Sequence, residues 1–264
     1  MKKQIAFLFV LFIGTFALHA EIVELKHFNE IASYATPETL VITDIDDTIL
    51  VPPQMLGSDE WFAHRMKKHR EGGLPSHSAL ERTVSEAQAV REISEMKLVE
   101  SGTDKIIQSL QKKGLCVMGL TVQGSAVSRR TNNQLKFNNI DLTVNSLSKE
   151  DQYFPLGGQT MLYRNNILFT TGVSKGEALF TLLDKIKVMP KRIIFIDDKT
   201  SNVEEVEKWA KKRNVQYIGL RYSFSDQNKA SFRPDIAEVQ FNQSTFTHLL
   251  SDDEALALMN KKVS

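Results

Sequence analysis

The sequence has very little cysteine. Its single thiol, Cys116, has no partner within the 264 residues, so the fold must depend on its core and not on a disulfide. Cys116 lies in the apolar run 115–120, which favours a buried, unreactive thiol. The six histidines show no spacing typical of a zinc site, and we find no internal repeat.

The chain also lacks an excess of charge of either sign. Its formal net charge is +1, and it stays close to zero if Lys2 and Lys3 are removed with the first twenty residues. A nearly neutral protein is not expected to bind nucleic acid or an anionic membrane surface through its net charge. Hydrophobic residues make up 42% and charged residues 25% of the chain. These are ordinary values for a globular protein, and they exclude a disordered or collagen-like chain.

Residues 1–20 differ in character from the rest. Two lysines precede the apolar run 5–13, and small residues follow up to Ala17 and Ala20. This order is typical of a secretory signal peptide, with cleavage after Ala17 or Ala20. The alternative is an uncleaved membrane anchor, but the apolar run is short for a bilayer span. We therefore expect an exported protein, periplasmic or secreted, with no stable membrane anchor after cleavage.

Beyond residue 20, apolar stretches with the pattern of strands alternate with stretches that have the period of helices. We expect a first helix at 22–36, strands at 40–45, 115–121, 192–197 and 215–220, a hairpin at 160–171, and helices at 125–137, 175–187 and 202–213. A short strand at 141–144 and a final helix at 255–259 are further candidates. Strands that alternate with helices predict a doubly wound, Rossmann-like α/β domain, with a parallel sheet and helices on both faces.

Residues 54–100 interrupt this alternation because they show helix patterns and no strand signal. Two helices are predicted, at 58–70 and 77–98, and the second has an apolar stripe formed by Leu80, Val84, Ala87, Val90 and Ile93. We interpret the segment as a helical cap inserted after the first strand of a core domain that spans residues 21–264. Its basic run 64–70 could contact an anionic substrate, although a solvated helix face is the favoured interpretation.

Polar residues stand at four strand ends or helix starts. They are Asp44, Asp46 and Asp47 at the end of the strand 40–45, Thr121 at the end of 115–121, Lys175 at the start of the helix 175–187, and Asp197 and Asp198 at the end of 192–197, with Asn202 shortly after. Each has a simple structural explanation by itself, since an acidic pair can cap the next helix. However, the carboxyl ends of parallel strands share one edge of the sheet. Carboxylates gathered there predict a hard cation such as Mg²⁺.

This ordered set resembles the haloacid dehalogenase-like superfamily over residues 40–221. Its first motif, Asp-x-Asp-x-Thr, is matched by 44–48, and its second, a strand-terminal Thr or Ser, by Thr121. Lys175 matches the third motif, and the pair 197–198 matches the fourth. In this superfamily, an Asp two residues after the first Asp goes with phosphatases and phosphotransferases, which argues against dehalogenase chemistry. An exported chain of this kind is similar to periplasmic acid phosphatases.

The resemblance implies a Mg²⁺-dependent phosphatase that hydrolyses a small phosphate monoester through an aspartyl-phosphate. Asp44 would be the nucleophile and Asp46 the general acid and base, and a raised pKa of Asp46 would suit that role. Thr121 and Lys175 would bind the phosphate. The metal would be held by Asp44, Asp46 through its carbonyl, Asp197 and Asp198, with Thr48 and Asn202 as supporting residues.

Two alternatives and one departure from the superfamily pattern stay open. A phosphotransferase would use the same residues, and a non-catalytic ligand- or partner-binding protein could keep the same fold. The exported phosphatases often carry Asn-Arg after the residue equivalent to Thr121, whereas this chain has Val122-Gln123-Gly124. Arg129 or Arg130 could take the place of that arginine.

Overall fold

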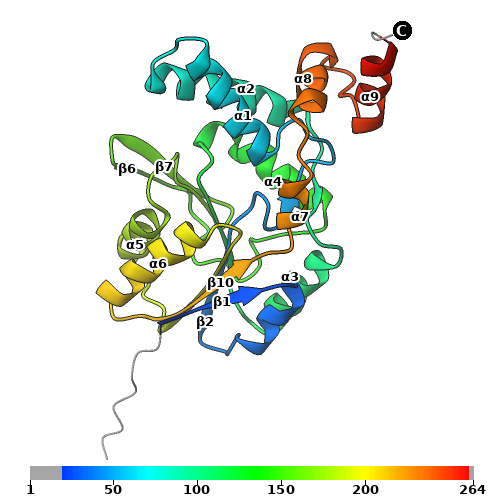
Figure 1. The fold of residues 1–264 in the computed structure, drawn as a ribbon. Coiled ribbons are helices and arrows are strands. Elements are labelled where there is room, and N and C mark those ends of the chain that lie inside the picture. Colours follow the sequence, from blue (N-terminus) through cyan, green and yellow to red (C-terminus); the bar gives the residue numbers. More distant parts are fainter. Residues whose placement is uncertain (1–19, 262–264) are drawn as a thin grey trace, which may run out of the picture.

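An eight-stranded sheet forms the centre of the computed structural model, which describes residues 20–261 (Figure 1). The predicted signal peptide lies outside these residues, apart from Ala20. In spatial order, the strands are β1 (Ala20–Leu25), β10 (Gln216–Tyr222), β9 (Arg192–Asp197), β2 (Thr39–Thr43), β5 (Val117–Thr121), β8 (Ile167–Phe169), β7 (Gln159–Arg164) and β6 (Gln152–Leu156). The strands from β1 to β8 pair in parallel, and β7 and β6 extend the sheet in antiparallel fashion. The prediction of a largely parallel α/β sheet is confirmed.

Helices cover both faces of this sheet because its strands are apolar on both sides. Val41 of β2 packs into the core on one face, which also contains α3 (Thr103–Lys112), α4 (Ser128–Phe137) and the 3-10 helix η1 (Phe28–Ser33). Its neighbour Ile42 packs on the opposite face with α5 (Lys175–Lys185) and α6 (Thr200–Lys212). Successive residues of a strand point to opposite faces, so a continuous apolar run such as β2 predicts burial on both sides. The doubly wound arrangement is therefore confirmed.

The segment between β2 and β5 contains α1 (Asp59–Glu71) and α2 (Ser76–Ile93). The prediction that it holds no strand was wrong. The chain enters and leaves through β3 (Leu50–Val51) and β4 (Lys97–Leu98), which form a two-stranded antiparallel pair. The second helix accordingly ends at Ile93 and not at 98, because Ser94 is already extended, with φ −80° and ψ 137°.

Two further expectations were wrong for identifiable reasons. Residues 22–25 belong to strand β1 and not to a helix, because they pair in parallel with β10 almost two hundred residues later. Residues 142–145 form a turn and not a strand. There, the Asp141 carboxylate accepts hydrogen bonds from the Thr143 backbone N–H at 2.9 Å and its hydroxyl at 2.6 Å. Such a bond lets an Asp side chain replace the backbone pairing of a strand.

The C-terminal segment adds α7 (Asp226–Ala230), α8 (Pro234–Gln243) and α9 (Asp252–Lys261), and α8 and α9 lie on the same side of the molecule as α1 and α2 (Figure 1). Trp61 of α1 and Ala237 of α8 share one small apolar cluster, and the Gln240 side chain accepts a hydrogen bond from the Leu56 backbone at 2.9 Å. The final helix predicted at 255–259 is thus part of a longer one. Among the described residues, no helix combines the length and apolarity needed to span a membrane.

Candidate active site

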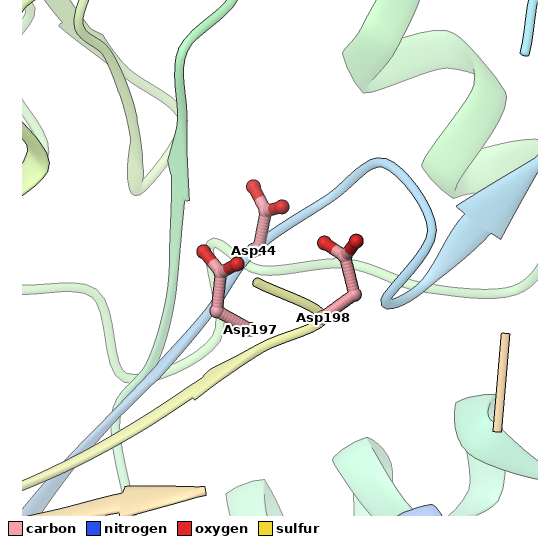
Figure 2. Close-up of side chains that lie close together, drawn as sticks. All are labelled: Asp44, Asp197 and Asp198. Atoms are coloured by element: carbon pink, nitrogen blue, oxygen red, sulfur yellow. The ribbon is translucent and has the colours of Figure 1, made fainter. Parts of the chain in front are cut away.

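Three carboxylates converge at the carboxyl edge of the sheet. Asp44 directly follows the buried strand β2, and its backbone N–H donates to the Ile196 carbonyl of β9 at 2.8 Å, so the two strand ends are locked in register. Asp197 ends β9 and Asp198 follows it. Figure 2 shows the three side chains directed to the same side, and each offers an oxygen within 4.8 Å of the others. All-oxygen donors at this spacing fit a hard divalent cation such as Mg²⁺.

Lys175 joins two of these acids from the start of α5. Its Nζ lies 2.7 Å from Asp44 Oδ1 and 2.6 Å from Asp197 Oδ2. The helix begins there because the Ser174 side chain caps it, accepting a hydrogen bond from the Glu177 backbone. Burial alone lowers the pKa of Lys175, but the carboxylates of Asp197 and Asp44 more than reverse this and raise it above its ordinary value. Lys175 therefore carries a positive charge deep in the site.

Asp44 has the opposite balance. Burial raises the pKa of its carboxyl group well above the ordinary value; Lys175 opposes this shift, whereas Asp197, Asp198 and Asp46 add to it. A nucleophilic carboxyl group must be ionised to react. The positive charge of Lys175 is therefore not enough to keep the Asp44 carboxyl group ionised. A cation bound at this cluster would supply the further positive charge.

Asn202 and Lys229 hold the other two acids of the cluster. Asn202 Nδ2 donates to both carboxylate oxygens of Asp197 at 3.0 Å, and the Lys199 backbone N–H donates to Oδ1 at 2.8 Å. Asp198 Oδ2 accepts a hydrogen bond from Lys229 of α7. The sequence predictions did not include Lys229, which lies 31 residues further along the chain and in no motif.

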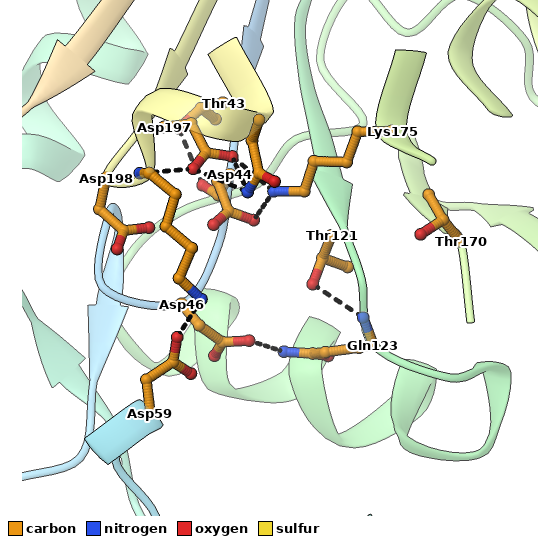
Figure 3. A network of polar contacts seen from close by, with 12 residues as sticks. Thr43, Asp44, Asp46, Asp59, Thr121, Gln123, Thr170, Lys175, Asp197 and Asp198 are labelled. Carbon is orange, nitrogen blue, oxygen red and sulfur yellow. Dashed lines mark hydrogen bonds and ion pairs between the residues drawn. The ribbon is translucent and has the colours of Figure 1, made fainter. Parts of the chain in front are cut away.

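Asp46 makes contacts that the sequence did not predict. Its Oδ2 accepts from Gln123 Nε2 at 2.6 Å (Figure 3). Its Oδ1 accepts from Arg91 of α2. Burial by itself raises the pKa of Asp46, but Arg91 and Gln123 outweigh it and hold the pKa below its ordinary value. The expectation that the pKa of Asp46 is raised is therefore wrong, because the sequence prediction did not include its cationic partner Arg91.

The arginine that contacts Asp46 is Arg91, whereas the sequence suggested Arg129 or Arg130 for this site. Arg129 is exposed, and Arg130 is tied to the end of α2, where its Nη2 donates to the Ser94 carbonyl at 2.6 Å. Arg91 is 13% exposed, and its Nε and Nη2 are buried and have no hydrogen-bond partner among residues 20–261. The sequence contained a signal for this contact. Arg91 follows Leu80, Val84 and Ala87 at the same helical spacing, so a charged residue ends the apolar stripe of this helix.

Thr121 and Thr48 stand at different places relative to this cluster. Thr121 ends β5, and its hydroxyl, which accepts the Gln123 backbone N–H at 3.2 Å, points toward the space beside Asp44 and Asp46 (Figure 3). Thr48 is fully buried, and its hydroxyl has no hydrogen-bond partner in the described part of the chain. Asp47, which directly precedes Thr48, adopts a left-handed backbone with φ 56°. Burial, followed by Asp59 and Asp198, raises the pKa of Asp47 to about 8, so this acid is largely neutral at pH 7.

The basic run on α1 does not form a solvated face throughout, which corrects the favoured interpretation. Arg65 is 7% exposed and donates to Glu86 of α2 at 2.8 and 2.9 Å and to Glu238 of α8 at 3.0 Å. His69 Nε2 lies 3.0 Å from the same Glu86. The run therefore joins α1 to α2 and to the C-terminal segment.

A cavity of about 740 Å³ lies between the sheet edge and the helices α1 and α2. Asp46, Asp47 and Lys199 line it from the core, and Arg91 lines it from α2. Lys199 also pairs with Asp59, the first residue of α1. Two ion pairs, Arg91–Asp46 and Lys199–Asp59, therefore connect the inserted helices to the strand ends across this space.

Comparison with known proteins identifies the family of this chain. Residues 24–256 match the family described as "Protein of unknown function (DUF2608)". The chain belongs to this family. A relative from Chlamydia pneumoniae, named "Putative outer membrane protein", is 26% identical over 266 residues, which cover 100% of this chain and 99% of the relative. A protein from Rickettsia prowazekii, named as uncharacterized, is 26% identical over 235 residues, 85% of this chain and 84% of its own length.

A solved structure is also similar to this DUF2608 protein, at a lower level. The haloacid dehalogenase-like family hydrolase from Streptococcus pneumoniae aligns over 75% of this chain and 100% of its own, with 12% sequence identity and a TM-score of 0.42. A score this low supports no conclusion about activity. The functional argument for the DUF2608 chain therefore depends on its own side chains.

Proposed function

We propose that this chain is a Mg²⁺-dependent phosphatase that hydrolyses a small phosphate monoester through an aspartyl-phosphate on Asp44. The observation that carries the proposal is the convergence of Asp44, Lys175 and the pair 197–198, which come from three separate parts of the chain, at one edge of the sheet. The order and identity of these residues match the haloacid dehalogenase-like motifs. A binding protein would have no evident need for a buried lysine held between two acids.

The acid cluster supplies the ligands for the metal. Asp44, Asp197 and Asp198, with the carbonyl of Asp46, would hold Mg²⁺, which when bound supplies positive charge to the phosphoryl oxygens. Lys175 adds a second positive charge beside Asp44 Oδ1, so that the carboxylate can approach a phosphate dianion without strong repulsion. The Thr121 hydroxyl and the backbone N–H groups that follow it would donate hydrogen bonds to phosphoryl oxygens.

Asp46 carries the proton in this proposal. In the first step, an Asp44 oxygen attacks phosphorus, the P–O bond to the alcohol breaks, and Asp46 gives its proton to the leaving oxygen. In the second step, Asp46 takes a proton from water, which attacks phosphorus and releases Asp44 and inorganic phosphate. Asp46 must be protonated to begin, yet Arg91 and Gln123 favour its ionised form in the structure described.

Arg91 resolves this conflict if it transfers from Asp46 to the substrate. Its Nε and Nη2 have no partner within residues 20–261, and a guanidinium binds phosphate oxygens well through parallel N–H groups. A phosphate that enters the cavity would draw Arg91 away from Asp46. Asp46 would then lose its strongest stabilising charge and become able to hold a proton.

Export is the proposed location. The first twenty residues carry the signal-peptide pattern, and the relatives from Chlamydia pneumoniae and Chlamydia trachomatis are named as outer membrane proteins. Fusing residues 1–25 to a reporter enzyme that is active only outside the cytoplasm tests this, and a reporter that stays cytoplasmic would contradict it.

The activity is tested with an aryl phosphate and the protein that begins at Glu21. Turnover should require Mg²⁺, disappear in Asp44→Asn and fall steeply in Asp46→Asn. Asp235→Asn, which alters an exposed acid outside the cluster, should keep normal turnover. If no phosphate ester in a broad panel is hydrolysed with Mg²⁺, the ligand-binding alternative is favoured. Release of phosphate to an added alcohol faster than to water would instead identify a phosphotransferase.

A further inference from the structure

Large apolar side chains from two elements stay exposed where they face the cavity. Leu80 and Val84 of α2 are 44% and 36% exposed, and Val122, in the loop after β5, is 48% exposed. Phe62 of α1 lines the same space. Single exposed apolar residues are normal on a protein surface, but several that converge on one cavity indicate a binding site for an apolar group.

Charged groups line the cavity beside the strand ends and again near the start of α2, where His77 Nε2 lies 3.4 Å from Glu81. Arg91 contacts Asp46, and Lys199 contacts Asp59. Between these two places, the apolar residues of α2 that line the cavity are Ala87, Val84 and Leu80, at the spacing of one helix face, and Gln88 is the polar residue beside them. A sugar or polyol placed against this face would bury hydroxyl groups without enough partners, which weakens binding.

We propose that this cavity binds the alcohol part of the substrate, and that this alcohol is an apolar aryl or alkyl group and not a sugar or polyol. The inference rests on the proposed phosphatase function for the other end of the substrate. The phosphate would lie beside Asp44 and Arg91, and the apolar group would extend along α2 toward Leu80. A volume of about 740 Å³ is within the range of pockets that enclose small organic ligands.

The substrate preference of the unaltered protein is the first test. With Mg²⁺ present, kcat/KM for 2-phenylethyl phosphate, whose leaving alcohol is as basic as that of a sugar, should exceed that for glucose 6-phosphate by roughly tenfold or more, as expected for a site that excludes unpaired hydroxyl groups. Equal values, or a preference for the sugar phosphate, would overturn the proposal.

Substitutions in the cavity wall test whether these residues cause the preference. Leu80→Gln and Val84→Gln should lower the ratio of kcat/KM for 2-naphthyl phosphate to that for methyl phosphate. Val144→Gln is the matched control, since Val144 is 43% exposed and lies outside the cavity lining; it should leave this ratio unchanged. An unchanged ratio in both cavity variants would show that the wall does not select the alcohol.

A binding measurement separates this inference from the phosphatase proposal. Calorimetry with Mg²⁺ compares 2-naphthylphosphonate with methylphosphonate, neither of which needs to be hydrolysed. If no ester is turned over but the naphthyl compound binds more tightly, and Leu80→Gln removes the difference, the apolar site stands and the phosphatase proposal fails. If esters are turned over and the two phosphonates bind equally, the apolar site fails alone.

Discussion

Replacing Arg91 by glutamine tests the most specific contact in the site. In the structure, the guanidinium contacts Asp46 through Nη1, and its Nε and Nη2 have no partner in the described part of the chain. If these free groups bind the phosphoryl oxygens, Arg91→Gln removes charged hydrogen bonds to the substrate. The backbone role of Arg91 is kept, because the Arg130 and Gln134 side chains donate to its carbonyl and not to its side chain.

The size of the effect follows from the hydrogen bonds that form and break when the substrate binds. A phosphate would receive two hydrogen bonds from Nε and Nη2, while the bond from Nη1 to Asp46 would be broken. The net difference is therefore about one charged hydrogen bond, or about 1.5–3 kcal/mol. Since each 1.4 kcal/mol corresponds to a factor of ten, kcat/KM should fall roughly 10- to 150-fold.

The pH dependence gives a second readout with a defined sign. Arg91 lowers the pKa of Asp46 in the free protein, so Arg91→Gln should raise it. Asp46 is active as an acid only when protonated, and kcat/KM reports the free protein. The decline of kcat/KM at high pH should therefore begin at a higher pH in Arg91→Gln than in the unaltered protein.

Two further variants complete the experiment. Arg91→Lys should recover part of the lost kcat/KM, because it restores the charge but not the fork of N–H groups. Arg129→Gln alters an exposed arginine that lies outside the cavity lining, and it should leave kcat/KM unchanged. If Arg91→Gln falls by less than roughly threefold, or its pH profile does not move, Arg91 serves only to join α2 to the core.

Three other outcomes are expected. Mg²⁺ at about a hundred times its Kd should stabilise the protein by about 2.7 kcal/mol in thermal unfolding, and Asp197→Asn should remove this effect; an equal shift in that variant would place the cation elsewhere. Burial alone raises the pKa of Glu86, but Arg65 and His69 lower it below 4.5. Glu86→Gln should therefore lower the free energy of unfolding in urea by about 2 kcal/mol at pH 7. This difference should shrink as the pH falls below 4.5, because Glu86 is then protonated in the unaltered protein. Gly176→Ala should destabilise the fold by about 1–3 kcal/mol and lower turnover, because its Cβ would lie 2.9 Å from the Glu205 carbonyl and 2.5 Å from the Trp209 ring; unchanged unfolding would mean that α6 can shift.

The strand ends that build the acid cluster could be predicted from the sequence alone. The strands β2 and β9 are continuous apolar runs, and each is followed directly by carboxylates. Burial on both faces requires a parallel sheet covered by helices, and parallel strands present their carboxyl ends at one edge. That rule needs no knowledge of the final packing, so Asp44, Asp197 and Lys175 could be grouped before the structure was known.

The same local patterns could not separate strand from helix at residues 22–25. Ile22, Val23 and Leu25 suit either element, and a parallel partner at 216–222 decides the outcome. Periodicity reports only which residues share a face. It does not report whether an edge position of the sheet is available to a segment at the other end of the chain.

The groups that surround the acids could not be predicted from the sequence and are known from the packing of the helices. Arg91 reaches Asp46 across 45 residues of sequence, Lys229 reaches Asp198 across 31, and Glu238 reaches Arg65 across 173. These contacts depend on how α2, α7 and α8 are oriented over the sheet edge, which is set by the packing of side chains such as Trp61 against Phe241. The pKa of Asp46 therefore shifts in the direction opposite to the one expected from its neighbours in the sequence, because its nearest charge comes from a distant helix.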